Sequence, residues 1–221
     1  FVFDDKNGNG IQDAGEIGVA NVEMTISGIA GDGTNVSLMA TTNSQGLYNI
    51  SDVPPGNYTL SIEVPNGYNL TSGFQGNNST IDSDFADDNN LDITLSSGQS
   101  VTTLDAGLLR NTSIGDFVWH DKNVNGLQDI GELGIEGVSI SLSGQTGTGN
   151  LITQNTVTDA NGYYNFDGLL PGIYTLYFSP ILGHEFTLSN RDPLDISDSD
   201  VINGEIANII VSSGDLLTQC D

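Results

Sequence analysis

The sequence predicts an all-β protein that consists of two tandem antiparallel β-sandwich domains with no significant helix. Three observations lead to this prediction. Landmark residues recur at a fixed spacing, apolar and polar residues alternate within short segments, and Gly-, Pro- and Asn-rich turns separate these segments. No window of about 12 residues keeps apolar residues at the 3.6-residue period of an amphipathic helix.

The sequence consists of two similar copies of one unit. Landmarks of the first half recur 116 positions later, so the two copies align without a net gap. The pairs are Asp5 and Asp121, Glu16 and Glu132, Gly46 and Gly162, Gly56 and Gly172, Gly98 and Gly214, and Asp105 and Asp221. A period of this length is that of complete domains. We therefore predict domains over residues 1–109 and 110–221, joined by a stiff junction over residues 106–116, and expect them to be consecutive units of a longer tandem.

The strand signals follow the same order in both copies. Residues with period-two alternation cover 22–26, 58–64 and 91–95 in the first copy, and 138–142, 174–178 and 206–211 in the second. Turn signals such as "NSQG", "PPG" and "SSG" lie between them, with "DANG" and "LPG" at the matching places of the second copy. Phe3 and Trp119, near the start of the copies, are expected core aromatics.

Acidic residues dominate the charge of the chain. There are 29 Asp and Glu against 4 Lys and Arg, which gives a formal net charge of -25. Such a surface repels phosphate backbones and anionic headgroups, so nucleic acid and membrane surfaces are poor partners. No run of about 20 apolar residues is present for membrane insertion. Hard cations are the partners that this charge favours.

Each copy also contains a stretch with the ligand spacing of a calcium loop, "DDKNGNGIQDAGEI" at 4–17 and "HDKNVNGLQDIGEL" at 120–133. Both match D-x-[DN]-x-[DN]-G-x5-E, in which alternate side chains, the carbonyl of the seventh position and a terminal Glu supply oxygens to Ca²⁺. The predicted ligands are Asp5, Asn7, Asn9, Ile11, Asp13 and Glu16 in the first loop, and Asp121, Asn123, Asn125, Leu127, Asp129 and Glu132 in the second. An Asx-rich turn without an ion is the alternative. Two matches in register favour calcium, with at least one ion per repeat.

The flanking helices of a helical calcium sensor are absent. Glycines surround the terminal Glu of each loop, and a β-alternating segment follows. The loop therefore has to connect strands, which favours a structural ion over a calcium-triggered switch.

A second acidic cluster follows later in each copy. Its members are Asp82, Asp84, Asp87 and Asp88 in the first copy, and Asp192, Asp195, Asp198 and Asp200 in the second. The shared part is "DSD", and carboxylates two positions apart can chelate one ion. Asp82, Asp84, Asp198 and Asp200 are the ligands we expect if this cluster binds a second Ca²⁺. A solvated acidic loop is the other interpretation.

Nothing in the sequence indicates an enzyme. His120 and His184 have no counterpart in the first copy, where Asp4 and Tyr68 stand. No G-x-S-x-G nucleophile motif precedes a helix.

The stretch "IGDFVWHDKNVNGLQDIGELGIEGVSISL" (114–142) resembles the opening of the B-type repeats of serine-aspartate-repeat bacterial surface proteins. "TDANGYYNFDGLLPGIYTLYF" (158–178) and "DAGL" (105–108) fit the same pattern, and the resemblance spans nearly the whole chain. It implies Ig-like, prealbumin-like sandwiches that bind calcium and hold an adhesin away from the cell wall.

The function expected from these features is that of a calcium-stabilised structural repeat, either a stalk or spacer or a filament segment, of an extracellular bacterial adhesin or surface fibre. Its expected partners are neighbouring repeats of the same polypeptide, with self-assembly into fibres through strand edges left open. The alternative is a ligand-binding adhesion module that recognises protein or glycan through the sandwich loops, since the loops 28–35 and 144–151 differ between the copies.

Overall fold

The computed structural model describes residues 1–86, 88–191 and 197–221. These residues form two compact units, Phe1–Arg110 and Asn111–Asp221. The described part contains strands, turns and bridges and no helix, so it has no helix that is long and apolar enough to cross a membrane. The predicted all-β class is confirmed.

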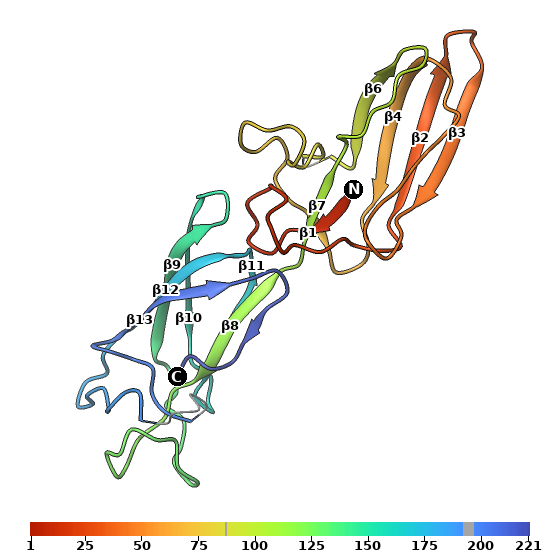
Figure 1. Cartoon of the computed structure of the whole chain (residues 1–221). Coiled ribbons are helices and arrows are strands. Elements are labelled where there is room, and N and C mark those ends of the chain that lie inside the picture. The colour runs from red at the N-terminus through yellow and green to blue at the C-terminus, as the bar shows by residue number, and fades with distance from the viewer. Residues whose placement is uncertain (87, 192–196) are drawn as a thin grey trace. The chain divides into compact units, whose positions relative to one another are not determined.

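The first unit is a sandwich of two sheets. Its larger sheet is antiparallel, with the order β3-β2-β4-β6 (Figure 1). The strands are β2 (Glu23–Ala30), β3 (Asn35–Thr41), β4 (Gly56–Glu63) and β6 (Asn90–Leu95). The smaller sheet has the order β1-β7-β5, with β1 (Val2–Asp4), β5 (Asn69–Leu70) and β7 (Ala106–Leu109).

The second unit repeats the larger sheet in the order β10-β9-β12-β13. These strands are β9 (Ser139–Thr146), β10 (Leu151–Val157), β12 (Gly172–Phe178) and β13 (Glu205–Val211). Its smaller sheet has the order β11-β8-β14, with β8 (Thr112–Phe117), β11 (Tyr163–Leu169) and β14 (Leu216–Leu217).

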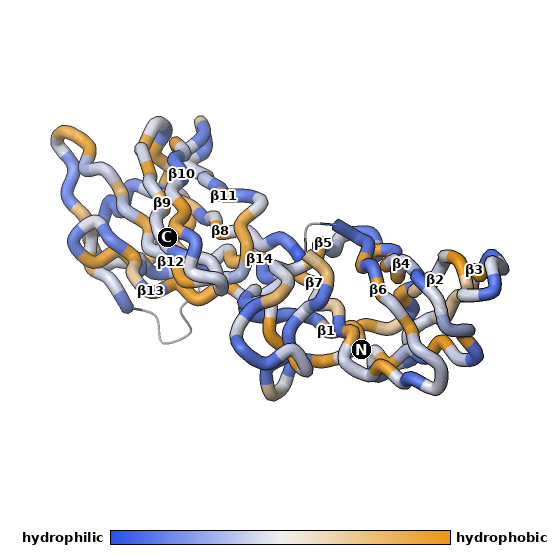
Figure 2. Tube along the Cα trace, turned by 90° about the horizontal axis from the view of Figure 1, so that it is seen from above, coloured by the Kyte–Doolittle hydropathy of each residue, from blue (hydrophilic) through white to orange (hydrophobic). Residues whose placement is uncertain are grey.

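Period-two alternation places the core between the two sheets. Met24 and Ile26 on β2 and Leu60 and Ile62 on β4 are buried, while the residues between them face outward. The same alternation buries Ile140 and Leu142 on β9. Polar and apolar positions succeed one another along the trace in Figure 2. The alternation predicted from the sequence therefore gives each larger sheet one apolar face, and this face packs against the core.

The smaller sheets differ from the expected antiparallel pattern. β1 pairs with β7 in parallel, and β14 pairs with β8 in parallel. These partners lie far apart in the sequence and are not joined by a hairpin, which removes the constraint that makes neighbouring strands antiparallel. The stretch 106–116, expected to be a junction, instead supplies β7 to the first unit and most of β8 to the second.

The segment after the first acidic loop lies between β1 and the turn that follows β3, and glycines allow the close backbone contacts there. Phe3 forms an isolated antiparallel bridge with Gly18. A Cβ atom built on Gly18 would lie 2.0 Å from the carbonyl oxygen of Gln45, in the turn that follows β3. Trp119 and Gly134 repeat the bridge in the second unit. Only glycine allows the two backbones to come this close.

We expect Gly18→Ala to destabilise the first unit by roughly 1–3 kcal/mol, because the added methyl group has to push the 43–46 turn away. Gly31→Ala is the matched control, since its Cβ would meet only the Pro55 oxygen at 3.5 Å. Urea unfolding followed by far-UV circular dichroism measures both variants. The fluorescence of Trp119, the single tryptophan, reports the unfolding of the second unit. Its urea midpoint should be the same in both variants as in the unmodified chain. Equal stability of the two variants would contradict this packing.

Candidate metal centre

The two acidic loops are closed at their ends by the backbone. In the first unit the amide of Asp4 donates to the carbonyl of Ile17 at 2.9 Å. The amide of His120 donates to Leu133 at 2.9 Å in the second unit. The two ends of each loop therefore lie side by side, and the twelve predicted positions lie within a closed turn. The first loop follows β1 in Figure 1.

Asp5, the first position of the first loop, is the centre of its hydrogen-bond network. Its side chain is completely buried. One carboxylate oxygen accepts from the amides of Gly8 and Asn9, at 2.7 and 3.2 Å. The other accepts from the Gly10 amide at 2.7 Å and from the Thr71 hydroxyl at 2.6 Å. The loop is thus folded around one carboxylate and is tied to the residue that follows β5.

The second loop repeats this arrangement around Asp121. Its oxygens accept from the amides of Val124 and Gly126, at 2.7 and 2.8 Å, and from the Thr187 hydroxyl at 2.5 Å. The limited burial of Asp121 acts to raise its pKa, but these hydrogen bonds outweigh that effect and hold the pKa below its ordinary value. Sequence reasoning missed Thr71 and Thr187, which lie 66 positions beyond their partners.

The side chains of the third, fifth and ninth positions converge in both loops. The amide nitrogens of Asn7 and Asn9 both donate to the same oxygen of Asp13, at 2.7 and 2.8 Å. Asn123 and Asn125 meet Asp129 in the same way, at 2.8 and 2.9 Å. These predicted ligands are therefore brought together in each copy.

The terminal Glu of each loop points back into it. Glu16 accepts from the amides of Lys6 and Asp13, at 2.8 and 2.9 Å. Glu132 accepts from Lys122 and Asp129, at 2.8 and 3.0 Å. Burial raises the pKa of Glu16, the two amides oppose this, and the negative charges of Asp5 and Asp13 add to the rise. A cation beside these carboxylates would relieve that repulsion.

The seventh position of each loop pairs with the second acidic cluster. Ile11 forms an isolated bridge with Asp82, and Leu127 forms one with Asp198. One oxygen of Asp82 and one of Asp198 is buried without a hydrogen-bond partner in the described part of the protein. Unpaired buried carboxylate oxygens are costly, so their recurrence at the same place in both units fits a bound cation.

The donor chemistry of the loops fits Ca²⁺, a hard cation that takes six to eight oxygen ligands. Carboxylates, Asn side chains and a backbone carbonyl supply such oxygens in each loop. Among the described residues, no three Asp, Glu, His or Cys side chains form a ready metal cluster by themselves. A Ca²⁺ ion in either loop would therefore need Asn and backbone oxygens as well as carboxylates.

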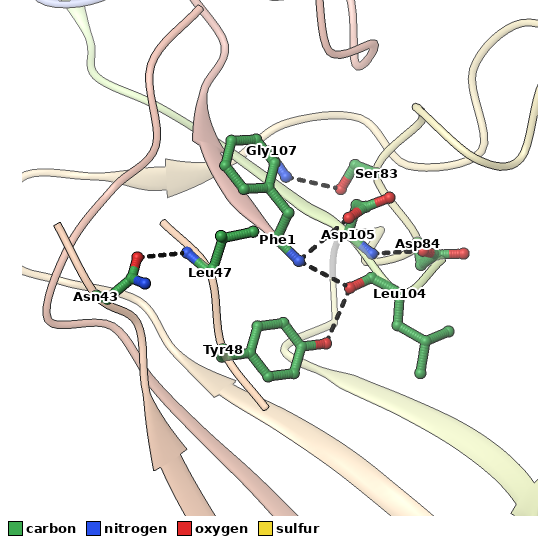
Figure 3. Close-up of polar contacts among 9 residues, drawn as sticks. All are labelled: Phe1, Asn43, Leu47, Tyr48, Ser83, Asp84, Leu104, Asp105 and Gly107. Atoms are coloured by element: carbon green, nitrogen blue, oxygen red, sulfur yellow. Dashed lines mark hydrogen bonds and ion pairs between the residues drawn. The ribbon is translucent and has the colours of Figure 1, made fainter. Parts of the chain in front are cut away.

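The two carboxylates of the first "DSD" stretch, expected from their spacing to share one ion, lie against different neighbours. Asp82 lies against the first acidic loop, whereas Asp84 lies against Asp105 (Figure 3). The Asp84 amide donates to the Asp105 carbonyl at 2.8 Å, and the Asp105 amide donates to the Asp84 carboxylate at 2.7 Å. Burial raises the pKa of Asp84 to about 6, helped by the neighbouring charges of Asp105 and Asp82.

The second unit carries a related acidic group around Asp200. The amide of Asp200 donates to the carbonyl of Asp221 at 2.6 Å. Burial raises the pKa of Asp221 to about 8, and the charges of Asp116 and Asp200 add to this. Burial also raises the pKa of Asp116 to about 6. Asp105 and Asp221 recur at the 116-residue spacing, which was a usable signal for them, whereas Asp116 had none.

Of the remaining members of the second cluster, Asp88 is the one that lies among the described residues. Asp88 is exposed and accepts from the side chain of Asn90 at 2.7 Å. Asp87, Asp192 and Asp195 lie outside the described residues.

One tyrosine in each unit forms a hydrogen bond to a backbone carbonyl close to the last residues of that unit. The Tyr48 hydroxyl donates to the carbonyl of Leu104 at 2.9 Å (Figure 3), and the Tyr164 hydroxyl donates to that of Cys220. These two hydrogen bonds hold the residues next to Asp105 and Asp221 against the sandwich.

The SdrD B-like domain family matches residues 1–108 and again residues 112–221. The chain belongs to this family. Serine-aspartate repeat-containing protein F of Staphylococcus epidermidis is 34% identical over 218 residues, which cover 97% of this chain and 12% of the relative. Serine-aspartate repeat-containing protein E of Staphylococcus aureus is 35% identical over 218 residues, covering 97% of this chain and 18% of the relative. The chain thus spans less than a fifth of these relatives.

Among solved structures, the Bacillus anthracis TIE protein aligns with 95% of this chain and 32% of its own, at 16% identity and a TM-score of 0.34. The resemblance deduced from the sequence motifs is confirmed by the family match. SdrD B-like domains are structural repeats of bacterial cell-surface adhesins and not enzymes, and this chain is an extracellular segment of that kind.

We expect Asp5→Ala to destabilise the first unit by roughly 2–4 kcal/mol even in EDTA, because three amides and a hydroxyl lose a buried acceptor. Asp121→Ala is the matched variant and should cost clearly less, since Asp121 is only half-buried and water can reach its donors. Urea unfolding in EDTA followed by circular dichroism compares them. An equal loss of unfolding free energy in both variants would show that the burial of the aspartate does not determine how much its removal destabilises the unit.

Proposed function

We propose that each repeat binds Ca²⁺ in its acidic loop and that the ion stiffens the sandwich as a spacer segment of a stalk or filament. The observation that carries the proposal is the same convergent set of oxygen-bearing side chains in both units. The first-unit ligands are Asp5, Asn7, Asn9, Ile11, Asp13 and Glu16, and the second-unit ligands are Asp121, Asn123, Asn125, Leu127, Asp129 and Glu132. Asp82 and Asp198, each with an unpartnered oxygen beside the loop, are candidate additional ligands.

A bound ion would act through charge and through connectivity. It would supply two positive charges to a chain whose formal net charge is -25, which reduces the self-repulsion of the compact state. It would also join the loop to the segment that contains Asp82 or Asp198, far along the chain. Loop, small sheet and second acidic segment would then move as one body.

The energetic effect follows from mass action. An ion that binds only the folded state stabilises it by RT ln(1 + [L]/Kd), about 1.4 kcal/mol at a tenfold excess over Kd and about 2.7 kcal/mol at a hundredfold excess. Extracellular calcium modules often have Kd values of about 10⁻⁴–10⁻³ M. Since a domain is stable by about 5–15 kcal/mol, one or two ions would add a substantial fraction of the unfolding free energy of each unit.

The spacer role follows from the tandem of similar units. Neighbouring repeats of the same polypeptide are the partners that a stalk requires. The loops 28–35 and 144–151 differ between the units, but no described feature of them favours a ligand-binding role.

Calcium at millimolar concentration should raise the melting temperature of the chain by several degrees relative to EDTA at matched ionic strength. The expected rise follows from the stabilisation above and the size of each unit. Circular dichroism melts measure it, and magnesium at the same concentration is the control, because Mg²⁺ keeps its waters and prefers a smaller octahedral site. Coincident melts in calcium and EDTA would rule out the proposal.

Glu132→Gln should weaken calcium binding at the second loop only, because it removes a bidentate carboxylate from that loop. Glu136→Gln is the matched control, since it makes the same charge change at an exposed position outside the loop. Isothermal titration calorimetry should show one site weakened at least about tenfold in the first variant and none in the second. If both variants titrate like the unmodified chain, the assignment of Glu132 as a ligand is wrong.

A further inference from the structure

Each larger sheet has one outer strand that lacks the usual protection against pairing with another chain. The outer strands are β3 and β6 in the first unit, and β10 and β13 in the second. β6 carries Asp92, and β13 carries Glu205 and pairs with β12 across a register shift. β3 and β10 each pair with one neighbour over 7 residues without a shift, and they contain neither a charged residue nor proline. Charges, prolines and bulges are what prevents edge strands from pairing, so β3 and β10 are open to a further strand.

The open edge of β10 presents a row of backbone donors and acceptors. Next to the hairpin turn, the Thr146 amide donates to the Asn150 carbonyl at 2.9 Å. Hydrogen-bonded and non-hydrogen-bonded pairs alternate along an antiparallel ladder, so every second residue of β10 bonds to β9. The remaining residues turn their amides and carbonyls away from β9; they are 151, 153, 155 and 157. In the part of the chain that the structure describes, these groups have no hydrogen-bond partner.

A second β10 strand can satisfy all of these groups in one register. When two copies run antiparallel and are centred on Gln154, Leu151 of one copy faces Val157 of the other. Thr153 faces Asn155 in the same way. These are the residues with free backbone groups, so each facing pair exchanges two hydrogen bonds. A shift of the register in either direction leaves some of the groups unpaired.

The side chains match in this register as well. Leu151 and Val157 are 85% and 61% exposed, and they would cover one another at both ends of the pair. Thr153 and Asn155 are also exposed and form the polar pairs between them. Directly opposite side chains that pack or hydrogen-bond to each other stabilise a sheet.

The equivalent register of β3 is less well matched. It is centred on Leu38, and it places Met39, which is 66% exposed, opposite Ser37. The two hairpins also differ in charge. Residues 137–158, which include β9 and β10, contain no charged residue, whereas Asp32 lies in the turn between β2 and β3. In a chain with a formal net charge of -25, a neutral hairpin is where two copies repel each other least.

We infer that β10 is a self-association strand, which pairs antiparallel with β10 of a second copy of this chain. The contact has twofold symmetry, because the same residues contribute from both copies. It joins the two larger sheets into one continuous sheet. This lateral contact goes beyond the spacer role and requires no metal ion.

A pair of cysteine variants tests the contact and its register. Gln154 lies opposite itself in a non-hydrogen-bonded pair, where Cα atoms are about 4.5 Å apart and a disulfide can form. Gln154→Cys should therefore give a disulfide-linked dimer under mild oxidation in EDTA at about 0.15 M salt, where charges more than about 8 Å apart are largely screened. Thr156→Cys is the matched control, because it is equally half-buried on the same face but lies opposite Ile152. Non-reducing gel electrophoresis measures the linked fraction, with the unmodified chain and its buried Cys220 as the background.

A pair of proline variants tests which edge is used. Thr153→Pro removes an amide at the open edge of β10 and leaves the hydrogen bonds to β9 intact. Ser37→Pro makes the same change at the equivalent position of β3. Sedimentation velocity at rising protein concentration should show association of the unmodified chain and of Ser37→Pro, and a monomer for Thr153→Pro. Far-UV circular dichroism verifies that both variants are folded.

The outcomes separate the alternatives. A chain that remains monomeric at the highest concentration reached, or equal linkage of the two cysteine variants, overturns the inference. Loss of association in Ser37→Pro but not in Thr153→Pro overturns the assignment to β10. Because linkage is measured in EDTA, failure of calcium to stabilise the chain leaves this result unaffected and bears only on the function proposed above.

Discussion

The hydrogen bonds to one carboxylate organise the acidic loop of each unit. Asp5 and Asp121 are the first positions of the two acidic loops, and each accepts from amides of its own loop. Each also accepts from a threonine hydroxyl supplied from 66 residues away. This long-range bond ties the loop to the sandwich. The loop geometry and its predicted ligand positions depend on this one residue in each unit.

The loop residues could be predicted because their pattern is local. Alternate oxygen-bearing side chains with glycine at the sixth position are visible within twelve residues, and the structure brings them together. The partners from elsewhere in the chain could not be found in this way. Thr71 reads as an ordinary threonine, and the spacing of Asp82 and Asp84 suggested one shared ion although the backbone directs them to different neighbours.

The same division applies to the fold. Alternation predicted β2, β4 and β9, because one face of each is buried and the other is exposed. β7 has four buried residues in succession and therefore carries no alternation. Its sequence resembles a connection between domains, and only its pairing with β1 and β5 shows that it completes the small sheet. Short central strands of this kind are decided by tertiary contacts and not by local pattern.

The parallel pairing of β1 and β7 has a mechanical consequence for a spacer. β1 is the first strand of its unit and β7 is the last, and they run in the same direction side by side. Tension along the chain pulls β1 at its beginning and β7 at its end, which are opposite ends of the pair. The hydrogen bonds between them are then loaded together in shear and do not open one at a time. The Asp5 amide bonds to Leu108 of β7, so the first residue of the acidic loop lies at the end of this loaded pair. If the proposed ion binds in that loop, it would reinforce the end of the β1–β7 pair that the Asp5 amide joins to Leu108.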